Sequence, residues 1–134
     1  MENIFEVQEG ILIGKGSEDI AKLATQLLDS KKADNIKVLK IDTKTIIADY
    51  FVIANGTSST HVRSLADEVE YQLSQVGIEP HHIEGKATGW ILLDYDTVIV
   101  HVFTREAREF YSLDKQWQDG KIIDVSEFLD NQEE

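Results

Sequence analysis

The segment YFVIAN, residues 50–55, narrows the folds open to this chain more than any other segment. It is apolar up to its final residue and rich in aromatic and β-branched side chains. A short run of this kind is typical of a central strand that is buried on both faces of a sheet. The segment GTSST ends the run, and the apolar side chains between Val62 and Val76 then recur at the spacing of one helix face. We therefore expect a buried strand that leads through a turn into an amphipathic helix.

Helical and strand patterns follow one another along the chain in the order helix, two strands, helix, three strands, helix. This order predicts an α/β fold of the mixed α+β kind, with a mixed sheet of about five strands and helices packed on it. We expect the strand at 50–55, the helix after it and the next strand to form a βαβ unit with a right-handed crossover. Because three helices are too few to cover both faces of such a sheet, one face or edge should stay partly open. The expected helices run from Ser17 to Lys32, from Val62 to Val76 and from a cap at Thr104, and the expected strands lie at 36–41, at 50–55, within 78–85 and in a hairpin at 89–103.

The length of 134 residues fits one domain with a single core. We divide the chain into an N-terminal extension at 1–16, a domain at 17–118 and a C-terminal tail at 119–134. The apolar residues of the tail are expected to dock on the domain, and they are Ile122, Val125, Phe128 and Leu129.

The formal net charge of −12 disfavours direct binding to nucleic-acid phosphates, which requires clustered Lys and Arg side chains. An acidic domain is suited to a basic protein surface through complementary potentials, although such a charge also serves solubility alone. The chain has no cysteine, which excludes disulfides and thiolate metal sites. It lacks the basic start and long apolar run of a signal peptide, and no segment approaches the roughly 18 apolar residues of a membrane span. We therefore expect a cytoplasmic protein without a membrane partner.

The loop from Gly56 to Thr60 has features of a phosphate-binding site, because it follows a strand, contains Gly, Ser and Thr, and opens a helix. It loosely resembles the Gly-Ser loop of nucleotidyltransferases, which need two or three carboxylates on a neighbouring strand to hold magnesium. The following strand region supplies only Glu79 and Glu84, and no P-loop signature is present. A turn with a hydroxyl cap explains the same residues. A nucleotide-binding or nucleotidyltransferase-like enzyme that uses this loop is our alternative function.

The four histidines do not predict a metal site. Adjacent strand residues point to opposite faces, so His81 and His82 cannot chelate one metal ion together. His101 lies in an apolar run and is expected to be a core histidine with satisfied hydrogen bonds. His61 falls in the first turn of a helix, where a solvated side chain is a simpler expectation than contact with a ligand or partner.

The hairpin segment GWILLDYDTVIVHVF, residues 89–103, holds the strongest candidate for a binding surface. Alternation along its first strand places Trp90, Leu92 and Asp94 on one face, and the face with Asp94 is the expected exposed one because a buried unpaired carboxylate is costly. Trp90 would then be a surface aromatic beside an acid and close to Tyr95, and Trp and Tyr often carry binding hot spots. Equally open is that Trp90 packs under the N-terminal segment or the third helix.

Two long segments, ADYFVIANGTSSTHVRSLADEVE and GWILLDYDTVIVHVFTREAREFYSLDKQW, strongly resemble the ribosomal silencing factor family, also called Iojap-related. The resemblance runs from about Ile20 to Trp117 and implies a small α/β domain related to nucleotidyltransferases, with neither their catalysis nor a cofactor. It implies binding to the large ribosomal subunit through its protein L-fourteen, on the face that meets the small subunit. Binding there would block subunit joining and slow translation when nutrients are short.

The resemblance also implies which residues meet the partner, because the contact surface of the family includes the Trp-containing strand. Asp96 departs from the family pattern, in which a glycine is common after the tyrosine of the turn, and is expected to alter that turn. An open apolar face or edge also favours a homodimer. The implied partner-binding residues are Trp90, Leu92, Asp94 and Tyr95 of the hairpin. The following helix lies nearby in sequence, and we expect its residues Arg105, Glu106 and Glu109 to contribute.

Overall fold

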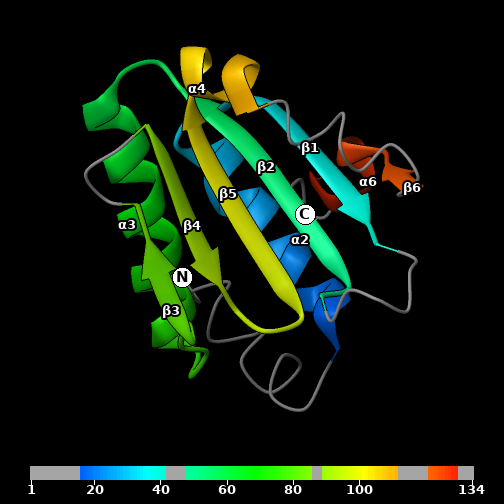
Figure 1. Cartoon of the computed structure of the whole chain (residues 1–134). Coiled ribbons are helices and arrows are strands. Elements are labelled where there is room, and N and C mark those ends of the chain that lie inside the picture. The colour runs from blue at the N-terminus through cyan, green and yellow to red at the C-terminus, as the bar shows by residue number, and fades with distance from the viewer. Residues whose placement is uncertain (1–15, 42–47, 86–88, 112–120, 130–134) are drawn as a thin grey trace.

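The computed structural model describes residues 16–41, 48–85, 89–111 and 121–129. Within these residues the chain forms a six-stranded sheet with helices packed on it, which confirms the predicted mixed α/β class (Figure 1). The described elements are α2 (Ser17–Ser30), β1 (Asp34–Lys40), β2 (Tyr50–Gly56), α3 (Ser59–Gln75), β3 (His82–Glu84), β4 (Trp90–Asp94), β5 (Val98–Thr104), α4 (Arg105–Tyr111), β6 (Lys121–Ile123) and α6 (Val125–Leu129).

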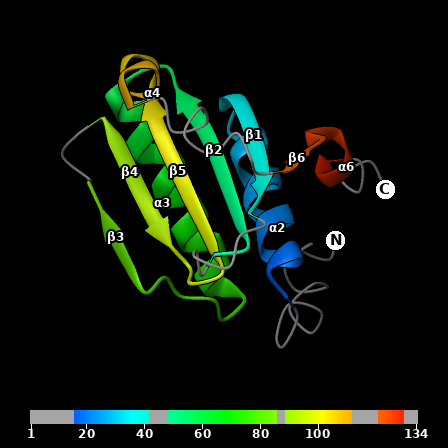
Figure 2. The same cartoon turned by 45° about the vertical axis from the view of Figure 1, so that its right-hand side comes forward.

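The strands lie in the order β3-β4-β5-β2-β1-β6, so that β3 and β6 form the two edges (Figure 2). β2 and β5 are parallel, and the other neighbouring pairs are antiparallel. The expected βαβ unit consists of β2, α3 and β3. β3 does run in the direction of β2, but β4 and β5 lie between them, so the expected pairing of these two strands is wrong. The β4–β5 hairpin inserts at this place because β5 can bury its apolar residues on both faces only beside the central strand.

The sixth strand, β6, was not predicted as a strand. It has only three residues, too few for a readable alternation, and it pairs with β1 so that Leu39 faces Ile122. Docking of the tail is confirmed for Phe128, which is buried and whose carbonyl oxygen accepts a hydrogen bond from Gln26 Nε2 at 2.9 Å. Ile122, by contrast, is 63% exposed and does not dock.

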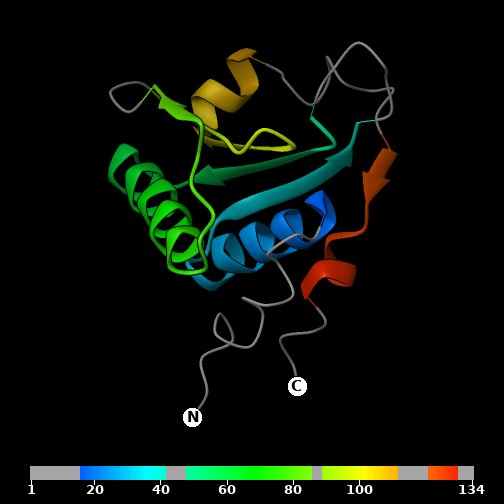
Figure 3. The ribbon, with the colours of Figure 1, turned by 90° about the horizontal axis from the view of Figure 1, so that it is seen from below.

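One face of the sheet carries the larger core. Helices α2 and α3 cover this face, while α4 lies on the opposite side (Figure 3). Side chains of alternate strand residues, such as Val52, Leu93 and Val100, point into this core together with Leu23 and Leu65 of the helices. β2 is buried along its whole length, as the apolar run at 50–55 predicts.

The second face of the sheet carries a smaller core and is covered only in part. Phe51, Ile53 and Phe103 are buried there, and Trp90 and Ile99 are half-buried against them. The helix that lies over this face, α4, spans only seven described residues. Among the described elements this face is therefore only partly covered, as expected, and its half-buried side chains include those along β4.

Candidate partner-binding surface

The first strand of the hairpin, β4, presents three of the predicted residues in one row on the second face. Trp90, Leu92 and Asp94 alternate with buried residues and are each half-buried. Their partners across the strand pair include Phe103 opposite Trp90 and Ile99 opposite Asp94, which fixes the row on the face with the smaller core. The predicted assignment of these three side chains to one face is confirmed.

The sequence left open whether Trp90 lies at the surface or packs under another element, and in the structure it does both in part. Its indole stacks on Phe103 with ring centroids 5.1 Å apart and meets Tyr111 of α4 at 4.6 Å. Its ring N–H donates a hydrogen bond to Nδ1 of His101 at 3.1 Å. The indole is thus held by the third helix and the sheet, while part of its surface stays accessible to a partner.

Asp94 is held in place by the turn that follows it. Its Oδ1 accepts a hydrogen bond from the backbone N–H of Asp96 at 2.8 Å, and His82 Nδ1 lies 3.7 Å from its other oxygen. Asp96 itself has φ of 77°, a conformation that glycine adopts at lower cost. Thr97 N–H donates to the carbonyl of Tyr95 at 2.9 Å and closes this turn.

Tyr95 does not belong to this surface. It is 5% exposed and packs in the larger core under α2 and α3, so the expectation that it lies beside Trp90 is wrong. The alternation that exposes Asp94 turns the next residue to the other face. Burial, with smaller contributions from Glu70 and Glu79, raises the pKa of the Tyr95 hydroxyl well above its ordinary value.

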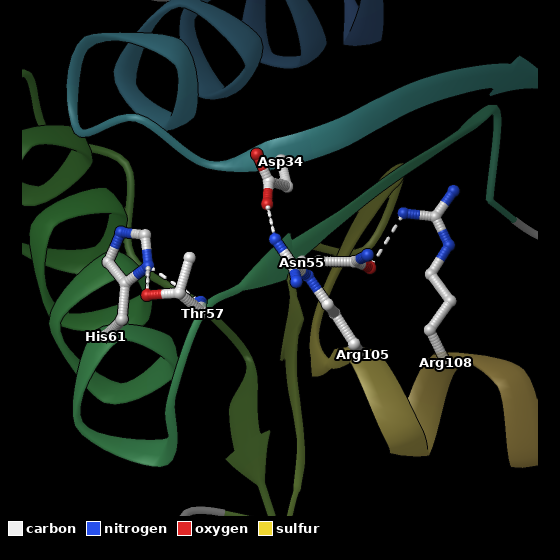
Figure 4. A network of polar contacts seen from close by, with 6 residues as sticks. All are labelled: Asp34, Asn55, Thr57, His61, Arg105 and Arg108. Carbon is white, nitrogen blue, oxygen red and sulfur yellow. Dashed lines mark hydrogen bonds and ion pairs between the residues drawn. The ribbon is translucent and has the colours of Figure 1, made fainter.

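Helix α4 supplies the three remaining predicted residues, all exposed: Arg105, Glu106 and Glu109. Arg105 is engaged within the chain, because its Nη2 lies 2.7 Å from Oδ2 of Asp34 in an exposed ion pair (Figure 4). The hydrogen bond and the charge of Asp34 raise the pKa of the Arg105 guanidinium. Glu106 and Glu109 add two exposed carboxylates to α4.

Arg108, which the sequence analysis missed, anchors α4 to the sheet. Its Nη1 donates to the backbone carbonyl of Asn35 at 2.6 Å and to Oδ1 of Asn55 at 2.9 Å, and the side chain is buried (Figure 4). At the start of the helix, Thr104 Oγ1 accepts the N–H of Ala107 at 3.2 Å, as the predicted cap requires. These bonds tie both turns of α4 to the ends of the strands.

Two aromatic residues of α4 complete the surface and were not predicted as site residues. Phe110 is 80% exposed and Tyr111 is 40% exposed, and their rings meet edge to face at 5.1 Å. The sequence places them on the apolar side of a helix, and that pattern alone predicts packing rather than exposure. We call Trp90, Leu92, Phe110 and Tyr111 the aromatic patch.

The glycine-containing loop before α3 has a structural reason for Gly56, Thr57 and Ser58. A Cβ on Gly56 would lie 2.8 Å from the backbone nitrogen of Val62, so only glycine fits this close approach. Ser58 caps α3 by accepting the N–H of His61 at 3.1 Å. Nδ1 of His61 in turn accepts the N–H of Thr57 at 2.9 Å (Figure 4).

His61 also connects this loop to the end of α2, because its Nε2 lies 3.0 Å from the carbonyl oxygen of Lys31. The side chain is half-buried and both ring nitrogens have partners within the chain, so the expectation of a solvated histidine is met only in part. The turn with a hydroxyl cap therefore accounts for the loop without a bound phosphate.

The carboxylates and histidines near β3 pair with one another instead of gathering at one point. His82 Nε2 lies 3.0 Å from Glu84, and His81 lies 3.9 Å from Asp96, at exposed positions. In the described ranges, no group of three or more His, Asp or Glu side chains could hold a metal ion. None of the described helices is long and apolar enough to cross a membrane.

Comparison with known proteins connects this chain to one family. Residues 15–134 match the sequence profile of the family described as "Ribosomal silencing factor during starvation". The chain is 35% identical to the ribosomal silencing factor of Bacillus subtilis over 109 residues, which cover 81% of this chain and 92% of that protein. It is 31% identical over 99 residues to the mouse protein named "Mitochondrial assembly of ribosomal large subunit protein 1", covering 71% of this chain and 43% of that protein. A crystal structure of a Chromobacterium violaceum protein superposes with a TM-score of 0.74 at 28% identity, covering 78% of this chain and 88% of that one.

Proposed function

The chain belongs to the ribosomal silencing factor family, and from this membership we propose that it binds the large ribosomal subunit and represses translation when nutrients are limiting. We propose that the contact is made to the large-subunit protein L-fourteen, and that the bound chain keeps the small subunit from joining. The name of the mouse relative, which refers to the ribosomal large subunit, supports the choice of subunit.

The observation that carries this proposal is the aromatic patch on the partly open face of the sheet. Among the described residues, Phe110 is the most exposed of the large apolar side chains, at 80%, and it lies on the helix that packs against Trp90 through Tyr111. Exposed aromatic side chains that are held rigidly by their neighbours are the residue types that dominate binding energies in protein interfaces. The patch therefore fits an apolar contact at the centre of a protein interface.

Acidic side chains on α4 and at the end of β4 indicate the charge of the partner. Glu106 and Glu109 are exposed on α4, and Asp94 lies at the far end of the β4 row. Together with the net charge of −12, they favour a basic surface, through complementary potentials that speed encounter and fix the orientation. A basic ribosomal protein meets this requirement, while exposed phosphate backbone does not.

The proposed mechanism is occlusion, and it requires no bond to be made or broken. A compact chain of this length has a radius of gyration of about 14 Å, so it cannot fit between two subunit surfaces that are in contact. Its relatives bear the names of regulatory factors, which supports a role without catalysis. The protein would act in the cytoplasm. If two chains associate through the face that carries the aromatic patch, this dimer has to dissociate before either chain binds the large subunit.

A subunit-joining experiment tests this function. Increasing amounts of the chain are added to purified large subunits before small subunits are supplied, and joined ribosomes are measured by gradient sedimentation. Occlusion predicts that joining falls linearly and stops at one chain per large subunit. Inhibition by a small fraction of one equivalent would indicate a catalytic action and would overturn the proposal.

A further inference from the structure

The indole of Trp90 is held by His101, which the sequence predicts as a core histidine with satisfied hydrogen bonds. Its burial is confirmed, but the expectation of satisfied hydrogen bonds is wrong for Nε2. The two residues lie on the same face of the β4–β5 pair as diagonal neighbours, two residues out of direct register, since Trp90 faces Phe103 and His101 faces Leu92. The ring N–H of Trp90 donates to Nδ1 of His101 at 3.1 Å. The indole packs against the rings of Phe103 and Tyr111. Stacking alone leaves the indole free to turn in its own plane, and the hydrogen bond to His101 prevents this rotation.

The state of His101 follows from its surroundings. It is 3% exposed, and burial lowers its pKa to about 3, so the ring is neutral in the physiological range. Since Nδ1 accepts the indole proton, the imidazole proton is on Nε2. Nε2 has no hydrogen-bond partner in the described part of the chain, and the ring meets Phe51 edge to face at 5.0 Å.

A histidine in this position is costly for stability, because it buries a polar nitrogen without a hydrogen bond. A leucine or phenylalanine would fill the same space between apolar neighbours without that penalty. The one interaction of His101 that an apolar side chain could not replace is the hydrogen bond to Trp90. His101 therefore lowers stability through its unpaired nitrogen, and what it contributes instead is a fixed orientation of the Trp90 indole on the proposed binding surface.

We propose that His101 is a positioning residue that fixes the indole of Trp90 for the ribosomal partner and occupies its only hydrogen-bond donor. This inference rests on the proposed function and adds to it the chemistry of the contact. Because Phe103 and Tyr111 pack against the indole and His101 accepts its N–H, a partner must meet the exposed edge of the ring with an aliphatic group. The aliphatic stem of a lysine or arginine provides one and keeps its charge for the acidic side chains. Fixing the ring in advance removes part of the ordering cost of binding.

The first test follows the indole proton in the free protein. In a ¹⁵N spectrum, the indole signal of Trp90 is identified as the one lost in Trp90→Phe. Leucine and asparagine have nearly the same shape, but only asparagine offers an acceptor oxygen close to the place of Nδ1. In His101→Leu the indole proton should exchange faster with water and move upfield, and in His101→Asn it should stay close to its original position. An unchanged signal in both variants would overturn the hydrogen bond.

The second test measures affinity for purified large subunits. His101→Leu should weaken binding about tenfold, while His101→Asn stays within about threefold of the unaltered chain. Equal affinity of the two variants would overturn the positioning role while leaving the proposed function intact. Failure of the unaltered chain to bind would overturn the proposed function itself, and the role of His101 with it.

A third variant avoids any change in the core, in case the His101 variants do not fold. Replacing Trp90 by benzothienylalanine keeps the size of the ring and removes the N–H. The proposal predicts a similar tenfold loss of affinity, because the ring is then no longer fixed. Affinity equal to that of the unaltered chain would contradict the proposal.

Discussion

The backbone nitrogen of Val62 lies 2.8 Å from the position that a Cβ on Gly56 would occupy. The first turn of α3 thus packs directly against the end of the central strand, β2. This contact explains a glycine that otherwise suggests a phosphate-binding loop. It also gives the first of five predictions.

Gly56→Ala should lower the free energy of unfolding by about 2 kcal/mol, because the added methyl group meets backbone that cannot move aside easily. Urea unfolding measures this change. Gly16→Ala is the matched control, since no atom lies within 4 Å of a Cβ there, and it should cost less than about 1 kcal/mol. Equal effects of the two substitutions would show that the close contact with Val62 is not the cause.

Asp96→Gly should raise the free energy of unfolding by roughly 0.5–1 kcal/mol. Asp96 has φ of 77°, which is costly for a residue with a Cβ, and the backbone hydrogen bond to Asp94 is retained by glycine. Thermal unfolding at two protein concentrations measures the change without interference from self-association. A destabilised variant would mean that the Asp96 side chain contributes more than its strained backbone costs.

The stability of the protein should fall with decreasing pH through His101. Its pKa is lowered to about 3 in the folded protein, against roughly 6.5 in the unfolded chain, so below pH 6.5 only the unfolded chain takes up this proton. The contribution is complete above pH 6.5 and is lost by about 1.4 kcal/mol per pH unit as the pH falls toward 5. Urea unfolding of the unaltered chain and of His101→Asn at pH 7 and pH 5 isolates the contribution of His101 to the free energy of unfolding. Parallel losses in both proteins would exclude a neutral buried imidazole.

Phe110→Ala should weaken binding to large subunits by about tenfold without changing stability, because the side chain is 80% exposed in the free protein. Tyr71→Ala is the matched control: it removes an aromatic side chain that is 60% exposed on α3, the helix on the opposite side of the sheet. It should leave binding unchanged. A larger effect of Tyr71→Ala than of Phe110→Ala would move the interface to the helical face.

The fold was predictable where a pattern is long enough to read. The apolar run at 50–55 and the helical spacing from Val62 to Val76 appear as β2 and α3. The strand order was not predictable, because residues within one strand do not specify whether β3 or β5 lies beside β2. β6 escaped prediction since three residues carry too little alternation.

The residues of the candidate surface were predictable on β4 and less so on α4. Alternation alone places Trp90, Leu92 and Asp94 together, and the same rule excludes Tyr95, whose position after Asp94 turns it into the core. Phe110 could not be recognised as exposed, because an apolar residue on a short helix ordinarily packs against the core. The role of His101 depends on a contact across two strands that no sequence spacing expresses.

Binding to large subunits with and without protein L-fourteen tests the central claim most directly. The unaltered chain should co-sediment with complete subunits, should fail to do so with subunits that lack L-fourteen, and should bind more weakly as salt is added. Trp90→Ala combined with Asp94→Lys should abolish co-sedimentation, whereas Asp94→Asn, which can keep the hydrogen bond to Asp96, should reduce it only in part. Undiminished co-sedimentation of the double variant, or equal binding to subunits without L-fourteen, would contradict the account.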